Sequence, residues 1–105
     1  MDRAALEKVA RVFTAFSDAT RLSILMELKG GALTVGQLVD LVEVSQGTVS
    51  KQLQLLFETG LLNREKKGAQ VFYSIGDPII FSLCSQVCEK LNRDAQANFE
   101  LTFHI

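Results

Sequence analysis

The chain has 105 residues, of which 48% are apolar and only one is proline, and its formal net charge is −1. This length leaves room for one domain, residues 1–105, and the apolar content excludes a disordered tail. No apolar run reaches the roughly 18 residues that a membrane span needs, and the N-terminus lacks the apolar core of a signal peptide. We therefore expect a cytoplasmic protein with no membrane partner.

The first thirty residues predict two helices. Residues 3–16 place apolar side chains at spacings of three and four, which is the pattern of one helical face. Residues 19–29 carry a second such pattern, and Ser17 or Asp18 offers its N-terminal cap. A pair of glycines then ends this helix, because glycine accepts the left-handed conformation that a helix end commonly needs.

The next segment predicts two short helices joined by a tight turn. Thr34 begins the first of them, and Gln37 stands three residues later, at the spacing of a capping box. The turn follows at Glu43, and Ser45 caps the second helix, which extends to about residue 58. The apolar stripe of this second helix consists of Val49, Leu53, Leu56 and Phe57.

The hydrophobic period then changes from that of a helix to that of strands. Segments 61–66 and 70–75 predict two short strands, and the three residues around Gly68 predict the turn of a β-hairpin. A last helix is expected over about residues 78–103, because Asp77 can cap it and proline is favoured at the first helical position.

Residues 34–75 predict a DNA-reading unit. Two short helices, the second with a polar outer face, match a helix-turn-helix whose second helix enters the major groove. A basic hairpin follows, with Arg64, Lys66 and Lys67 expected to cluster at its tip, as the wing of a winged helix-turn-helix would, although each feature alone could be ordinary solvated surface. We expect Lys51 and Gln52 to contact base edges, and the hairpin cations to contact the DNA backbone. The expected DNA-binding residues are Ser45, Gln46, Thr48, Ser50, Lys51, Gln52, Gln54, Arg64, Lys66, Lys67 and Gln70.

The run SDATRLSILMEL, followed by LTVGQLVDLVEVSQGTVSKQLQLLFETGLLNREKKGAQVFYSI, resembles the ArsR/SmtB family of metal- and stress-responsive repressors. The resemblance covers roughly residues 10–80. It implies a homodimer built from the first and last helices, which releases DNA when a ligand or an oxidant changes the dimer. Many members have histidine where Gln52 stands and proline or alanine at Gly47, and these departures imply a different operator preference with the same mode of binding.

The sensing chemistry is open at the level of sequence. The cysteine pair of many family members has no counterpart at the matching positions, and of the zinc ligands only Asp77 is present, because Ile79 and Lys90 stand where histidines would be expected. Cys84 and Cys88, four residues apart on the last helix, remain as soft ligands for As(III), Cd(II) or Cu(I), or as thiols open to oxidation. A third ligand would come from the other subunit, from His104 or from a carboxylate. The alternative is that both cysteines are inert, buried apolar residues.

The sequence therefore predicts a mainly helical domain with a small β-hairpin, a winged helix-turn-helix that dimerises through its first and last helices. The predicted function is sequence-specific repression of transcription at an inverted-repeat operator in double-stranded DNA, with release by a metal, a metalloid or a thiol-reactive signal. A protein-binding winged helix, or a DNA-binding regulator with inert cysteines, is the alternative. No catalytic constellation is present, so we expect no enzyme.

Overall fold

The computed structural model describes residues 1–95 and 103. They form four helices, a hairpin with one additional short strand, and a final helix, which confirms the predicted fold class. The elements are α1 (Arg3–Phe16), α2 (Ala19–Leu28), β1 (Leu33–Thr34), α3 (Val35–Val42), α4 (Gln46–Glu58), β2 (Leu62–Lys67), β3 (Gln70–Ile75) and α5 (Ile79–Ala95).

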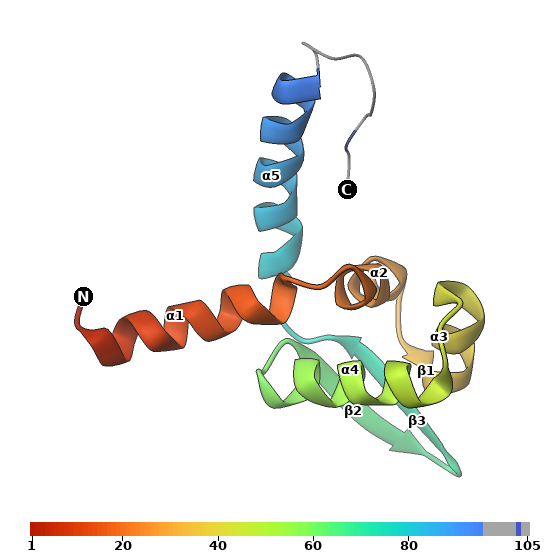
Figure 1. Cartoon of the computed structure of the whole chain (residues 1–105). Coiled ribbons are helices and arrows are strands. Elements are labelled where there is room, and N and C mark those ends of the chain that lie inside the picture. The colour runs from red at the N-terminus through yellow and green to blue at the C-terminus, as the bar shows by residue number, and fades with distance from the viewer. Residues whose placement is uncertain (96–102, 104–105) are drawn as a thin grey trace.

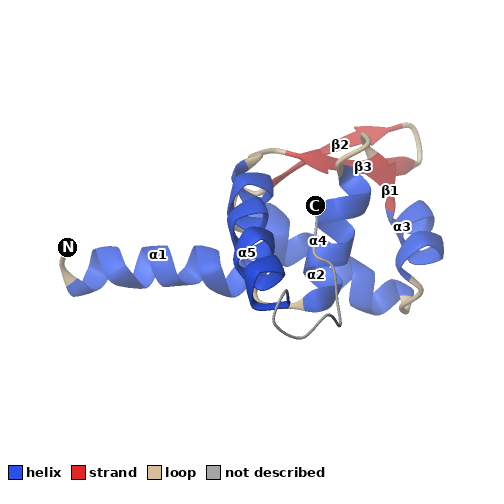
Figure 2. Cartoon of the chain, turned by 90° about the horizontal axis from the view of Figure 1, so that it is seen from above, coloured by secondary structure: helices blue, strands red, loops and turns tan. Residues whose placement is uncertain are grey.

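The three strands form an antiparallel sheet in the order β1-β3-β2, which lies on one side of the helices (Figure 2). Lys67 pairs with Gln70, so a two-residue turn closes the hairpin instead of the expected three residues. Gly68 lies in this turn at φ +63°, a left-handed conformation in which glycine carries no steric cost. β2 therefore ends one residue later than predicted, because this tighter turn brings Lys67 into the ladder, whereas β3 has the predicted bounds.

Polar caps define where the helices begin. Asp18, not Ser17, caps α2 by accepting a bond from the Arg21 amide at 2.9 Å. Thr34 and Gln37 form the predicted capping box at the start of α3. Between α3 and α4 the chain reverses at Glu43, which has φ +56° and ends α3 as a left-handed cap.

Every element except β1 contributes to one hydrophobic core. Helix α4 is held in it by the predicted stripe of Val49, Leu53 and Leu56, each 0% exposed. Phe57 is only partly buried, at the edge of this core. The other core residues are Ala15, Phe16, Ile24, Leu25, Leu28, Leu38, Leu61, Leu62, Tyr73 and Ile80.

Helices α1 and α5 project from this body (Figure 1). Leu6 is 49%, Phe13 58% and Val87 55% exposed, so most of the apolar stripe on each helix lies outside the core. The described part of α5 ends at Ala95, and the expected continuation over 96–102 lies outside the described residues. Phe103 is not helical: its backbone N–H and carbonyl both bond the Asn92 side chain, whereas a continuous helix would separate the two residues by about 16 Å.

No helix in residues 1–95 is both long enough and apolar enough to cross a membrane.

Candidate nucleic-acid interface

The core presents one face of α4 to solvent. Ser45 caps the helix by accepting a bond from the Thr48 amide at 3.2 Å, and it donates to the Thr48 hydroxyl at 2.9 Å. Because Val49 and the rest of the buried stripe face inward, the opposite side of the helix is accessible. The exposed polar side chains on α4 and its cap are Ser45, Gln46, Thr48, Ser50, Lys51, Gln54 and Glu58, of which all but the acidic Glu58 at the end of the helix were expected as DNA contacts.

The wing places its cations differently from the expectation. Lys66 and Lys67 lie beside the turn and are exposed, as is Gln70 opposite Lys67. Successive residues of a strand point to opposite faces, so these two lysines lie on different sides of the hairpin. The Lys67 ammonium lies 5.5 Å from the centre of the Phe72 ring.

Arg64 does not lie at the hairpin tip. It pairs with Tyr73, four residues before the turn begins at Gly68, and its guanidinium stacks 4.0 Å from the centre of the Phe57 ring on α4. The same guanidinium donates to Gln54 at 3.2 Å, and the amide nitrogen of Gln54 donates to Glu58 at 2.8 Å. Cation–π attraction and a hydrogen bond therefore join the wing to α4 at this point.

Gln52 is also placed differently from its exposed neighbours. Its side chain is half-buried on the flank of α4 that faces α2, and its Oε1 accepts a bond from Arg21 at 2.7 Å. The sequence predicted an apolar pattern for α2 and no role for Arg21. In the sequence Arg21 is marked only as a basic residue within a mostly apolar helix, and this does not identify Gln52 as its partner.

The local charge of this region differs from that of the whole chain. Residues 45–75 contain four basic residues and two acidic ones, although the chain as a whole has a net charge of −1. DNA affinity depends on the cations that meet phosphates rather than on the total charge. The α4 and wing region therefore carries the positive charge that such an interface requires.

A second feature is an apolar groove between α1 and α5. Its volume is about 500 Å³, and both cysteines lie in its wall. Burial, and then the neighbouring Cys88, raise the pKa of the Cys84 thiol. No cluster of three or more histidine, cysteine or carboxylate side chains occurs in residues 1–95 and 103, and His104 lies outside them. The residues along the groove are Phe13, Phe16, Ser17, Leu22, Ile80, Leu83, Cys84, Val87, Cys88 and Leu91.

Comparison with known proteins assigns the chain to a family. Residues 18–64 match the arsR family of bacterial regulatory proteins. The HTH-type transcriptional regulator MJ1325 of Methanocaldococcus jannaschii is 36% identical over 79% of this chain and 94% of its own length. The chain belongs to the ArsR family. It is accordingly a DNA-binding transcriptional regulator and not an enzyme.

Two further relatives resemble this ArsR-family chain over most of its length. The arsenical resistance operon repressor of Bacillus subtilis is 33% identical over 77% of this chain and 78% of its own length. The solution structure of the homodimeric winged helix-turn-helix DNA-binding domain Mb0332 from Mycobacterium bovis has a TM-score of 0.73 and 28% identity. The similarity covers 99% of this chain and 96% of that one, so it extends beyond the helix-turn-helix and the wing to α1 and α5.

The raised pKa of Cys84 predicts that its thiol reacts slowly with alkylating agents near neutral pH and that the stability of the fold depends on pH. Because only the thiolate reacts, alkylation of Cys84 by iodoacetamide should reach half its maximal rate above the pH of about 8.5 that is ordinary for cysteine. The folded state holds the proton more tightly than the unfolded state. The free energy that this tighter proton binding by Cys84 adds to folding is therefore fully present below the pKa of the unfolded chain. It is lost as the pH rises through the raised pKa of the folded state.

The rate is measured by mass spectrometry in the Cys88→Ser variant, with the urea-unfolded chain as the reference. Burial is the larger cause, so the pKa should stay raised without Cys88. If the alkylation rate of folded Cys84 reached half its maximum at the same pH as in the unfolded chain, or at a lower pH, the raised pKa of Cys84 would be contradicted.

Proposed function

We propose that this ArsR-family repressor binds an inverted-repeat operator as a homodimer, with α4 of each subunit in the major groove. The observation that carries the proposal is the exposed polar face of α4 beside the lysines of the wing, on a helix whose other face is fully buried. Residues 1–105 then act as one domain, with the reading unit at about 34–75. Such a regulator works where the DNA is, in the cytoplasm.

The exposed side chains divide into three groups by proposed role. Gln46, Thr48 and Lys51 project from the N-terminal half of α4, which is the part of a recognition helix that reaches base edges. The first amides of this helix lack intrahelical partners and favour anions, so Ser45 and Ser50 are proposed to bind phosphate beside them. Arg64 donates a hydrogen bond to Gln54, and we propose that both contact the DNA where α4 and the wing meet.

The wing is proposed to hold the DNA backbone. Lys66 and Lys67 lie on opposite faces of the hairpin next to its turn, and Gln70 stands opposite Lys67. A projecting loop with two exposed ammonium groups suits phosphate or minor-groove contact, because a lysine makes that contact as a point charge without a fixed geometry.

The dimer is proposed to form through α1 and α5. Leu6, Val9 and Phe13 on α1 and Ile79 and Val87 on α5 are all more than 40% exposed, and an exposed apolar surface of this extent marks an interaction site. The homodimeric Mb0332 domain resembles this chain over both helices, which supports the same assembly here. Two reading helices related by a twofold axis require half-sites about 34 Å apart, one helical turn of DNA.

The first prediction concerns the DNA interface. Alanine at both Lys51 and Gln52 should weaken binding to the selected operator by about 1–3 kcal/mol for each side chain that reads a base. Alanine at both Lys66 and Lys67 should weaken binding to all sequences alike and lower the salt slope of log K by about 1 for each lysine that neutralises a phosphate. Fluorescence anisotropy over a range of salt concentrations measures both effects.

The matched control is Lys8→Ala, which removes an exposed lysine from α1, away from the reading unit. Unchanged operator binding by the Lys51/Gln52 variant would exclude α4 as the reader. A wild-type chain without salt-dependent DNA affinity would instead favour the alternative, a winged helix that binds another protein.

The second prediction concerns the dimer. Phe13→Asp places a carboxylate on the exposed apolar stripe of α1. It should raise the dimer dissociation constant by about 100-fold or more, because the interface would no longer bury an aromatic ring and would have to bury a charge instead. Sedimentation velocity measures the change. Leu41→Asp, at a residue of α3 that is 50% exposed, is the control and should leave the dimer intact. Equal dissociation by both variants, or none by either, would contradict the assignment.

The inducing signal is proposed to act at Cys84 and Cys88. Residues four apart lie on the same face of a helix, and both thiols line the groove between α1 and α5, where a bound ion or an oxidised sulfur would disturb the proposed dimer helices. The thiols suit As(III), Cd(II) or Cu(I), and the similarity to an arsenical resistance operon repressor supports this class. The described residues of one chain supply two sulfurs and no third ligand, so any further ligand comes from beyond them.

The third prediction is that As(III), Cd(II), Cu(I) or a thiol oxidant releases the DNA complex in a cysteine-dependent way. Each agent is titrated into the complex of the wild-type chain and of a Cys84→Ser/Cys88→Ser variant, and release is followed by anisotropy. Release of the wild type alone supports the site. Release of both, or of neither, would leave a repressor with inert cysteines.

A further inference from the structure

Arg21 joins three helices through one guanidinium. Its Nε donates to the carbonyl of Ala15 at 2.8 Å and its Nη2 to the carbonyl of Thr14 at 2.9 Å, both in the last turn of α1. Its Nη1 donates to Oε1 of Gln52 on α4 at 2.7 Å. The last carbonyls of a helix lack intrahelical partners and lie at the negative end of its dipole. They therefore hold the planar guanidinium in one orientation.

This bond decides which end of the Gln52 amide faces Arg21. A guanidinium donates hydrogen bonds and never accepts them, so the atom bonded to it must be the carbonyl oxygen and not the amide nitrogen. The Nε2 group then points away from Arg21. No bond from Nε2 to another described residue is present, and every buried side-chain nitrogen or oxygen in the described structure has a partner. Nε2 therefore remains accessible to solvent.

The position of Gln52 suits DNA contact through this nitrogen. Thr48 stands one turn earlier on the same flank of α4 and is exposed. A glutamine that reads adenine uses its oxygen and its nitrogen together, accepting from N6 and donating to N7. Arg21 occupies that oxygen here. The remaining NH₂ group can only donate, and the guanine edge offers two acceptors, O6 and N7, in the major groove.

We propose that Arg21 is a positioning residue for operator recognition, which holds the Gln52 amide so that it reads an acceptor-bearing base, guanine before adenine. This inference rests on the proposed binding of α4 in the major groove and adds to it the direction of one contact. Arg21 itself touches no base.

The experiment is enrichment of a randomised duplex pool by the full-length chain, followed by affinity measurements on the enriched site. The wild type should prefer guanine over adenine by about tenfold at one position of each half-site. Gln52→Ala should remove the preference at that position only. Arg21→Met frees the amide to turn over, so adenine should be accepted there nearly as well as guanine. In the Gln52→Ala background, Arg21→Met should cause no further change.

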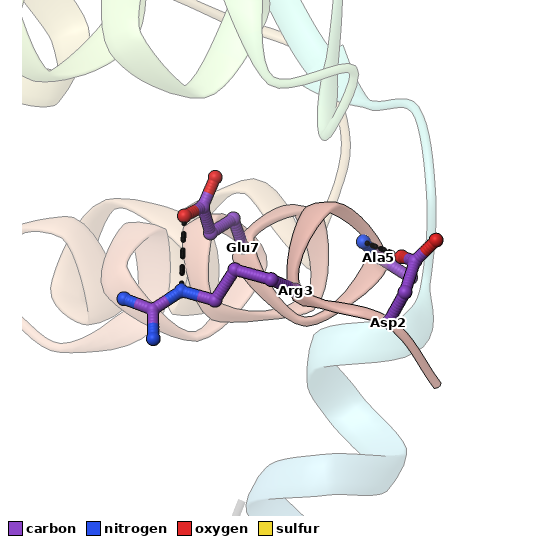
Figure 3. A network of polar contacts seen from close by, with 4 residues as sticks. All are labelled: Asp2, Arg3, Ala5 and Glu7. Carbon is purple, nitrogen blue, oxygen red and sulfur yellow. Dashed lines mark hydrogen bonds and ion pairs between the residues drawn. The ribbon is translucent and has the colours of Figure 1, made fainter.

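Two more variants separate positioning from folding. Gln52→Glu keeps an acceptor for Arg21 but has no donor, so the guanine preference should disappear although the bond between the helices remains. Lysine lacks the planar guanidinium that bonds Ala15, Thr14 and Gln52 at once, so Arg21→Lys should behave as Arg21→Met does. The matched control is Arg3→Met, since Arg3 is also a helical arginine but, among the described residues, its side chain pairs only with Glu7, at the surface, where it is 89% exposed (Figure 3). Thermal melting checks that each variant folds.

The outcomes are distinct. An unchanged base preference in Arg21→Met, or a guanine preference retained by Gln52→Glu, would overturn the inference. An effect of Arg21→Met on base preference that persists in the Gln52→Ala background would also overturn it. A uniform loss of affinity in Arg21→Met with no change in base preference would do the same, because it indicates a phosphate contact. If the wild type enriches no sequence at all, the proposed function fails and the inference fails with it.

Discussion

The burial of one stripe of α4 is the constraint on which the rest of the structure depends. Val49, Leu53 and Leu56 are completely enclosed, and together they fix both the axis of the helix and its rotation about that axis. Because a helix repeats every 3.6 residues, fixing the buried stripe also fixes which side chains point outward. The polar residues of α4 therefore reach solvent as a consequence of packing, without a separate device to expose them.

Two arginines then hold the two flanks of this helix. Arg64 from the wing stacks on Phe57 and bonds Gln54, while Arg21 from α2 bonds Gln52 and the end of α1. Each pairs a fixed donor fork with a glutamine oxygen, so each restricts a side chain that would otherwise rotate freely. The face of α4 that is proposed to read DNA thus has an exposed centre at Lys51, between two ordered edges.

The same network brings the proposed dimer helices close to the reading helix. Two of the three bonds of the Arg21 side chain end on carbonyls of α1, and Phe16 at the end of that helix lines the groove that contains both cysteines. The groove proposed for sensing and the helix proposed to read DNA are therefore linked through a single side chain, Arg21. A change in the packing of α1 against α5 would act on carbonyls that also hold Arg21, and through it Gln52.

The sequence by itself determined the five helices, the hairpin and their order, but not the short strand β1. The caps at Thr34 and Ser45, the stop after α4 and the buried stripe follow from local rules, because each depends on residues within one or two turns of one another. The tertiary structure alone decided the partners of Gln52 and Arg64 and the non-helical position of Phe103. Arg21 and Gln52 are 31 residues apart, and hydrophobic periodicity indicates which face of a helix is covered but not which side chain covers it. For that reason the sequence placed Gln52 among the free readers, whereas packing placed its oxygen on Arg21.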